Sequence, residues 1–232
     1  MVDLSGRDLH RGLNRVGTEA KRELSSVLAR ARNKEHAMFL VQELMPALIE
    51  KYGPAAATLA ADWYDEAREK AAAAGAFSVE VASAPARGHG VDALVGWAAK
   101  ETDDLVMFRE LVLGGYTRRV IQYGRSTVTR AAIADRGADG WMRQGDGDSC
   151  PFCLMLIGRG AVYGEKAVRF ASHDHCGCVA VPKFKGQPKP VLLKADGTRA
   201  TASARAQRTD DEQRRVDNER VRAWLEANPT AG

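Results

Sequence analysis

All four cysteines of this chain lie in one short segment, next to two of its five histidines. In chain order, the six residues are Cys150, Cys153, His173, His175, Cys176 and Cys178. A Cys-x-x-Cys turn brings two sulfurs to one side, where both can bind one tetrahedral ion. His173 and Cys176 repeat that gap about 20 residues later, a layout typical of a closed structural zinc site. The sequence therefore predicts a small module that is held together by zinc.

Six candidate ligands compete for the four places of a tetrahedral site. The predicted pairs are Cys150 with Cys153 and His173 with Cys176, and the alternates are Cys178 and His175. His175 can instead orient a ligand through its ring. Thiolates select zinc over magnesium or calcium, and a complete set of ligands leaves no open position, so we expect a structural ion. The alternative is four reduced thiols buried as small apolar side chains.

Upstream of the cysteines the sequence is typical of helices. Aromatic residues make up only 6% of the chain and alanine is plentiful, which favours helix over sheet. Apolar residues recur at helical spacing, and we expect these stripes to pack in a core. The predicted helices cover residues 4–31, 37–52, 54–75, 91–100 and 103–134. The second is expected to end at Gly53-Pro54. Phe77–Val81 alternates as a short strand, and residues 84–90 read as a linker.

Four arginines mark the second half of the helix predicted over residues 103–134. They are Arg118, Arg119, Arg125 and Arg130. We expect them to form a solvated face of the helix, and contact with phosphate groups is the alternative.

The chain's formal net charge of +4 lies entirely in its C-terminal part. Residues 183–232 are rich in Lys, Arg, Pro, Gly and Thr, which predicts a flexible tail that ends in a short helix near residues 210–227. Such a tail suits salt-dependent, sequence-independent contact with DNA, and the alternative is a solvated terminus without a partner. The candidate contacts are Lys183, Lys185, Lys189, Lys194, Arg199, Arg205 and Arg208.

Together these features predict an α+β, predominantly helical protein in three parts. A helical region covers residues 1–88, a zinc-held α+β module residues 89–182, and the basic tail residues 183–232. No apolar run is long enough to span a bilayer, and the N-terminus lacks the apolar segment of a signal peptide. We therefore expect the protein to fold in a reducing cytoplasm.

The chain carries few of the sequence motifs that indicate an enzyme. It contains no HExxH, Walker or GxSxG motif. The segment Ser172–His175 resembles the His-Asp-His part of treble-clef nucleases of the HNH type, but no Cys-x-x-Cys pair follows it. A metal-dependent nuclease with His173 or His175 as the base is therefore the alternative to a protein without enzymatic activity.

The cysteine segment resembles the MuF-like minor head proteins of tailed phages, in the form found in phages of actinobacteria. The resemblance is carried by Gly145–Leu156 and Gly158–Tyr163, and by His173-x-x-Cys176-x-Cys178 followed by Pro182. It places Cys150, Cys153, His173 and Cys176 on the family's metal-ligand positions, and Cys178 on its last cysteine.

The resemblance also implies a biological role. It implies a minor capsid protein that is assembled in the host cytoplasm, packaged inside the procapsid and retained in the virion. Its expected partners are the portal protein, other capsid or scaffold components and, through the tail, packaged DNA, which it would accompany on ejection. Neither a membrane nor a small-molecule substrate is expected.

Overall fold

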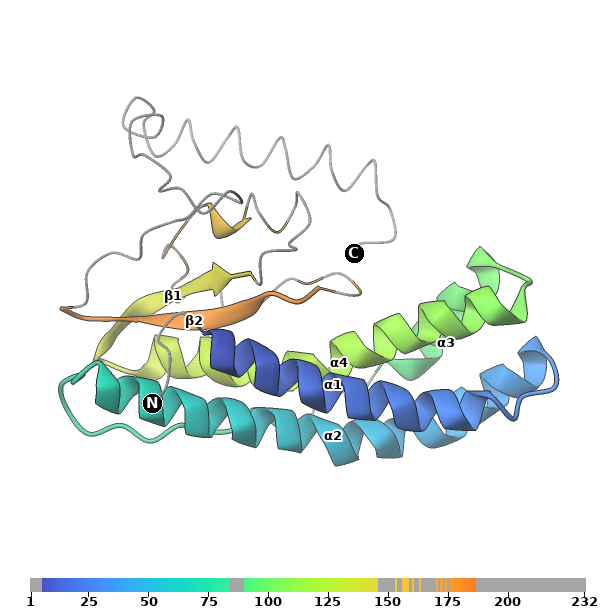
Figure 1. Ribbon diagram of the computed structural model, residues 1–232, viewed down its shortest axis with the longest axis horizontal. Helices are drawn as coiled ribbons and strands as arrows, with labels where there is room; N and C mark the ends of the chain where they lie inside the picture. Colours follow the sequence, from blue (N-terminus) through green and yellow to red (C-terminus); the bar gives the residue numbers. More distant parts are fainter. Residues whose placement is uncertain are drawn as a thin grey trace, which may run out of the picture.

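The computed structural model shows four helices followed by two antiparallel strands (Figure 1). The residues that it describes are 6–83, 90–145, 153, 156–158, 160, 163, 170, 172, 174 and 176–186. The elements are α1 (Arg7–Leu28), α2 (Lys34–Lys70), α3 (Val91–Glu101), α4 (Leu105–Ala134), β1 (Ala138–Gln144) and β2 (Val179–Phe184). This order confirms the predicted α+β, predominantly helical fold. Among the described residues, no helix combines the length and apolar character needed to cross a membrane.

Helices α1, α2 and α4 run side by side and form the body of the molecule (Figure 1). Helix α1 buries one stripe that contains Leu9, Leu13 and Leu24, each at most 1% exposed, as the apolar spacing predicted. Helix α4 contacts every other element, and its buried residues are spread over most of its circumference. It is therefore the central element against which the other helices and the sheet pack.

Helix α2 is one continuous helix, so the predicted break at Gly53-Pro54 is wrong. Pro46 and Pro54 both lie inside it, and each removes one backbone hydrogen bond. Fully buried apolar residues such as Met45 and Ile49 offset this loss, since each contributes about 1.5–3 kcal/mol by burial. Gly53 has a packing role instead, because a Cβ there would lie 2.7 Å from the ring of Tyr123 on α4.

The expected strand at Phe77–Val81 is also wrong, because these residues form neither helix nor strand. Phe77 packs instead against the ring of Tyr64, with centroids 6.0 Å apart, and beneath the guanidinium of Arg68. The backbone N–H of Ala82 donates to the Thr127 hydroxyl of α4 at 3.0 Å. The alternation of apolar residues in this segment thus reflects packing on helices rather than pairing in a sheet.

The two strands form an antiparallel sheet that packs on α4 (Figure 1). Trp141 of β1 lies opposite Pro182 of β2, and its backbone also pairs with Tyr163. The indole of Trp141 stacks on Tyr163, with ring centroids 4.4 Å apart, and on Phe170, at 5.6 Å. The buried residues of helices and sheet make one continuous hydrophobic cluster.

A buried ion pair links α2 to the turn between α4 and β1. The Asp135 carboxylate accepts hydrogen bonds from Arg68 Nε at 2.9 Å, from the Tyr64 hydroxyl at 3.2 Å and from the Gly137 backbone at 2.7 Å. The side chain of Asp135 is 1% exposed and that of Arg68 is 13% exposed. This network fixes the direction in which the chain leaves α4 and enters the sheet.

Candidate metal centre

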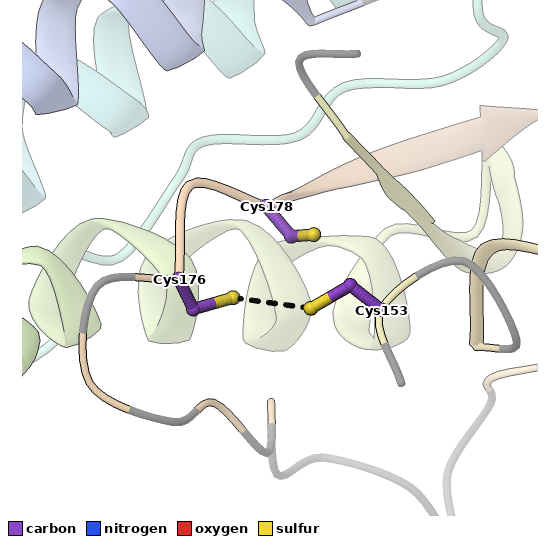
Figure 2. Close-up of side chains that lie close together, drawn as sticks. All are labelled: Cys153, Cys176 and Cys178. Atoms are coloured by element: carbon purple, nitrogen blue, oxygen red, sulfur yellow. Dashed lines mark hydrogen bonds between the residues drawn. The ribbon is translucent and has the colours of Figure 1, made fainter. Parts of the chain in front are cut away.

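Three cysteines converge at the end of the sheet, and their sulfurs point toward one another (Figure 2). The sulfurs of Cys153, Cys176 and Cys178 all lie within 4.8 Å of one another, and those of Cys153 and Cys176 are 3.5 Å apart. All three are free thiols, with exposed fractions of 2%, 8% and 1%. Four zinc–sulfur bonds of about 2.3 Å in a tetrahedron would place the sulfurs about 3.8 Å apart. The cluster therefore fits a metal ion such as zinc.

The local backbone explains why two of these sulfurs meet on one side. Cys176 and Cys178 lie two residues apart in the segment that leads directly into β2 (Figure 2). The chain bends between them, and both side chains lie on the side of the bend that faces Cys153 (Figure 2). Gly177 lies between them, so no third side chain competes for the space. Cys153 faces both from a helical residue elsewhere in the segment between the strands.

Arg125 of α4 forms hydrogen bonds to the backbone of the Cys176–Cys178 segment. Its Nε donates to the Cys178 carbonyl at 2.9 Å, and its Nη2 donates to the Cys176 carbonyl. The side chain is buried, with only 1% exposed. The prediction that this arginine belongs to a solvated face is therefore wrong, because the sheet and the cysteine segment cover this part of α4.

Two of the other arginines on α4 also bond to neighbouring backbone. Arg118 forms an ion pair with Asp174 at 2.9 Å and donates to the Ser172 carbonyl at 3.1 Å, and so holds the chain just before the cysteines. Arg119 donates to the Gly90 carbonyl at the start of α3. Of the four arginines, Arg130 is exposed as expected.

A second guanidinium approaches the cluster from the sheet. Arg143 of β1 is buried, and its Nη1 lies 4.0 Å from the sulfur of Cys176. Its guanidinium lies 3.8 Å from the centre of the Phe170 ring, and that of Arg125 lies 5.1 Å from the same ring. Cation–π contacts of this kind stabilise buried guanidinium groups. Two positive charges are thus held beside the three sulfurs.

The electrostatics of the cluster favour a thiolate at Cys176. Hydrogen bonds from the thiols of Cys153 and Cys178 lower the pKa of Cys176, and the charge of Arg125 acts in the same direction. The same hydrogen bonds, together with burial, raise the pKa of Cys153. Burial lowers the pKa of Arg125, and the nearby cysteines oppose that shift. Cys176 is therefore the first of the three thiols expected to ionise and to bind a metal cation.

The structure brings together part of the predicted ligand set. Cys153 and Cys176 meet as expected, and Cys178, predicted only as an alternate, joins them. Cys150, His173 and His175 lie outside the described residues. Sequence reasoning missed the two buried arginines. A signal for Arg125 existed, because it lies four residues after Ile121 and three before Val128 on the buried stripe of α4.

The basic residues predicted to contact DNA are only partly described. Lys183 lies in β2 and forms an ion pair with Asp139 at 3.1 Å, and Lys185 is exposed in the turn that follows. The others, Lys189, Lys194, Arg199, Arg205 and Arg208, lie outside the described residues, as does the short helix expected near residues 210–227. The charge of Lys183 is therefore already balanced within the sheet.

An open pocket of about 780 Å³ lies between α1 and α2. Its lining includes the carboxylates of Asp8, Asp62 and Glu66 but none of the three clustered cysteines. Negative charge of this kind disfavours phosphate groups, so the pocket does not suit nucleic acid. It is also separate from the cysteine centre.

Comparison with known proteins gives one match. A protein-family model described as VG15 protein matches residues 3–222, which include all four helices, both strands and the four cysteines. No curated protein and no solved structure matches the chain.

Proposed function

The chain belongs to the VG15 protein family, and we propose that it is a non-catalytic minor component of a tailed-phage head with a structural zinc ion. The observation that carries the metal part of this proposal is the meeting of three buried cysteines at one point of the core. The segment around them also carries the resemblance to MuF-like minor head proteins. The metal site and the head role are therefore proposed together.

The burial of the centre supports a structural ion. A catalytic zinc keeps one position open to water or substrate. Here the three sulfurs are at most 8% exposed and belong to the same hydrophobic cluster as the helices. Cys153, Cys176 and Cys178 would hold the ion, with the fourth ligand drawn from Cys150, His173 and His175. When bound, zinc supplies folding free energy, of order 10 kcal/mol in small zinc domains.

The proposed place of the protein is inside the procapsid, bound to the portal, and afterwards inside the virion. The resemblance of Gly145–Tyr163 to MuF-like proteins supports this location, and so does the match to the VG15 family over nearly the whole chain. Assembly would take place in the host cytoplasm, with portal and capsid or scaffold proteins as partners. No membrane and no small-molecule substrate enter this proposal.

Contact with packaged DNA is a further part of the proposal and depends on the tail. Lys183 is paired with Asp139, so the proposed contacts begin with Lys185 and continue through the basic residues after it. Contacts of lysine and arginine with phosphates weaken as salt rises and do not depend on sequence. Binding of duplex DNA by the full chain, lost when residues 187–232 are removed, would support this part.

The first experiment measures zinc per chain by elemental analysis on the wild type and on Cys176→Ala, with Ser25→Ala on the exposed face of α1 as the control. We expect one zinc per chain in the wild type and in the control, and its loss in Cys176→Ala. The variants Cys150→Ala, His173→Ala and His175→Ala then identify the fourth ligand. A folded wild type that binds no zinc would refute the metal site.

The same samples test the head role and the nuclease alternative. Co-purification with the portal protein of the same phage is expected for the wild type and is weakened when zinc is removed. Cleavage of duplex DNA that needs a divalent ion and disappears in His175→Ala would contradict the proposal and support the nuclease.

A further inference from the structure

The least expected feature of the molecule is the presence of buried cations in its core, Arg125 and Arg143. Arg125 is 1% exposed, and within the described part of the chain it forms no ion pair with a carboxylate. Its hydrogen bonds go to the carbonyls of Cys176 and Cys178, which are neutral acceptors. An arginine keeps its proton even when buried, so its charge has to be offset by an anion nearby.

The clustered thiols are able to supply this negative charge, and two of them belong to the residues whose carbonyls Arg125 binds. Burial and the neighbouring Arg143 lower the pKa of Arg125, whereas Cys176, Cys178 and Cys153 raise it and so favour its charged form. Three thiolates around a divalent cation would leave one net negative charge, and a fourth thiolate from Cys150 would leave two. Two buried guanidinium groups, those of Arg125 and Arg143, are available to balance this charge. The two carbonyl bonds hold the guanidinium of Arg125 close to that charge, and Phe170 lies beside it.

We propose that Arg125 is the buried counter-charge of the metal centre, and that its guanidinium sets how tightly the cysteines hold the ion. The proposal rests on the zinc site proposed above and concerns a residue outside the ligand set. It places one determinant of metal affinity on α4, a helix that contributes no ligand to the cluster. Groups that hydrogen-bond to metal-ligating residues commonly change metal affinity 10–100-fold when they are removed.

A purely structural role for Arg125 makes a different prediction. If the guanidinium only joined α4 to the segment before β2, its loss would destabilise the protein with and without metal alike, and the affinity of the folded protein for zinc would stay unchanged. If it is a counter-charge, the positive charge itself matters. A lysine at the same position would then preserve zinc binding although it cannot bond to both carbonyls as a guanidinium does.

The test compares Arg125→Gln, Arg125→Lys and Arg130→Gln in the full chain. Arg130 lies on the same helix but is exposed, so it controls for loss of one positive charge. Zinc affinity is measured by competition with a chromophoric chelator. Cobalt(II) absorption reports the number of thiolates bound, and circular dichroism reports the fold. We expect about 10- to 100-fold weaker zinc binding in Arg125→Gln, near wild-type binding in Arg125→Lys and no change in Arg130→Gln. The cobalt spectra at saturation should match.

The outcomes separate this inference from the zinc site itself. If the folded wild type binds no zinc, the proposed function fails before any variant is compared. If the wild type binds zinc and a folded Arg125→Gln binds it equally well, the zinc site stands and the counter-charge role is refuted. If Arg125→Gln does not fold, Arg125→Lys decides: a folded Arg125→Lys that binds zinc more than tenfold more weakly than the wild type contradicts the role.

Discussion

Replacing Asp135 by asparagine should test how strongly the sheet is fixed to the helices. The substitution keeps the size of the side chain but leaves the partly buried guanidinium of Arg68, which is 13% exposed, without its counter-charge. Breaking a buried ion pair by removing one partner costs about 3–5 kcal/mol. Arg68 keeps hydrogen bonds to the carbonyls of Ala74 and Gly75, so we expect the lower end, about 3 kcal/mol. For a domain of this size, that corresponds to a fall in Tm of roughly 6–12 °C.

Asp139→Asn is the matched control, because it removes the same charge from a surface ion pair. Asp139 bonds to Lys183 at 3.1 Å, but its side chain is 43% exposed, and such pairs contribute about 0–1 kcal/mol. Urea denaturation followed by circular dichroism gives the free energy of unfolding of both variants under the same zinc-loaded conditions. If Asp135→Asn lies within about 1 kcal/mol of Asp139→Asn, the buried pair does not stabilise the fold as argued.

Three further predictions address packing, metal and pH. Gly124→Ala should cost about 1–3 kcal/mol, because its Cβ would lie 2.5 Å from an α1 side chain and 2.9 Å from an α2 carbonyl. Gly96→Ala in α3, where the Cβ meets nothing within 4 Å, should instead raise stability by up to about 1 kcal/mol. A chelator should lower the Tm of the wild type but not that of Cys178→Ala, and equal shifts in calorimetry would contradict the metal site. Burial and the nearby Asp135 raise the pKa of Tyr64 above its ordinary value of 10.0, so the unfolded chain loses this proton first. Stability should therefore fall as the pH rises above about 10 and fall less steeply in Tyr64→Phe, which denaturation at several pH values can measure.

Local patterns in the sequence predicted much of the helical part. The stripe of α1 and the extents of α3 and α4 follow from apolar residues at helical spacing, and one helix satisfies that spacing without help from distant residues. The break expected at Gly53-Pro54 did not occur, because apolar residues on both sides of it, such as Ile49 and Ala57, are buried against other helices. Local propensity cannot include such contacts.

The pairing of the strands and half of the metal site could not be predicted from local sequence patterns. Strands β1 and β2 pair residues as far apart as Ala138 and Phe184, and neither strand alternates cleanly because most of its residues are buried. The spacing of the cysteines predicted that a metal site exists and named Cys153 and Cys176 for it. It named Cys178 only as an alternate ligand. Whether Cys178 joins the cluster depends on the direction in which the chain enters β2.

The position of the centre suggests why a helical protein of this kind would use an ion there. In the part of the chain that the structure describes, the sheet has two strands, and an isolated pair of strands is marginally stable in water. Its strands are joined by a long segment that contains Cys153, and an ion shared by Cys153, Cys176 and Cys178 would tie that segment to the start of β2. Arg125 ties the same point to α4. Metal binding would then stabilise the sheet and its contact with the central helix together. Loss of the ion would weaken the attachment of the sheet to the helices, and its effect would not be confined to one loop.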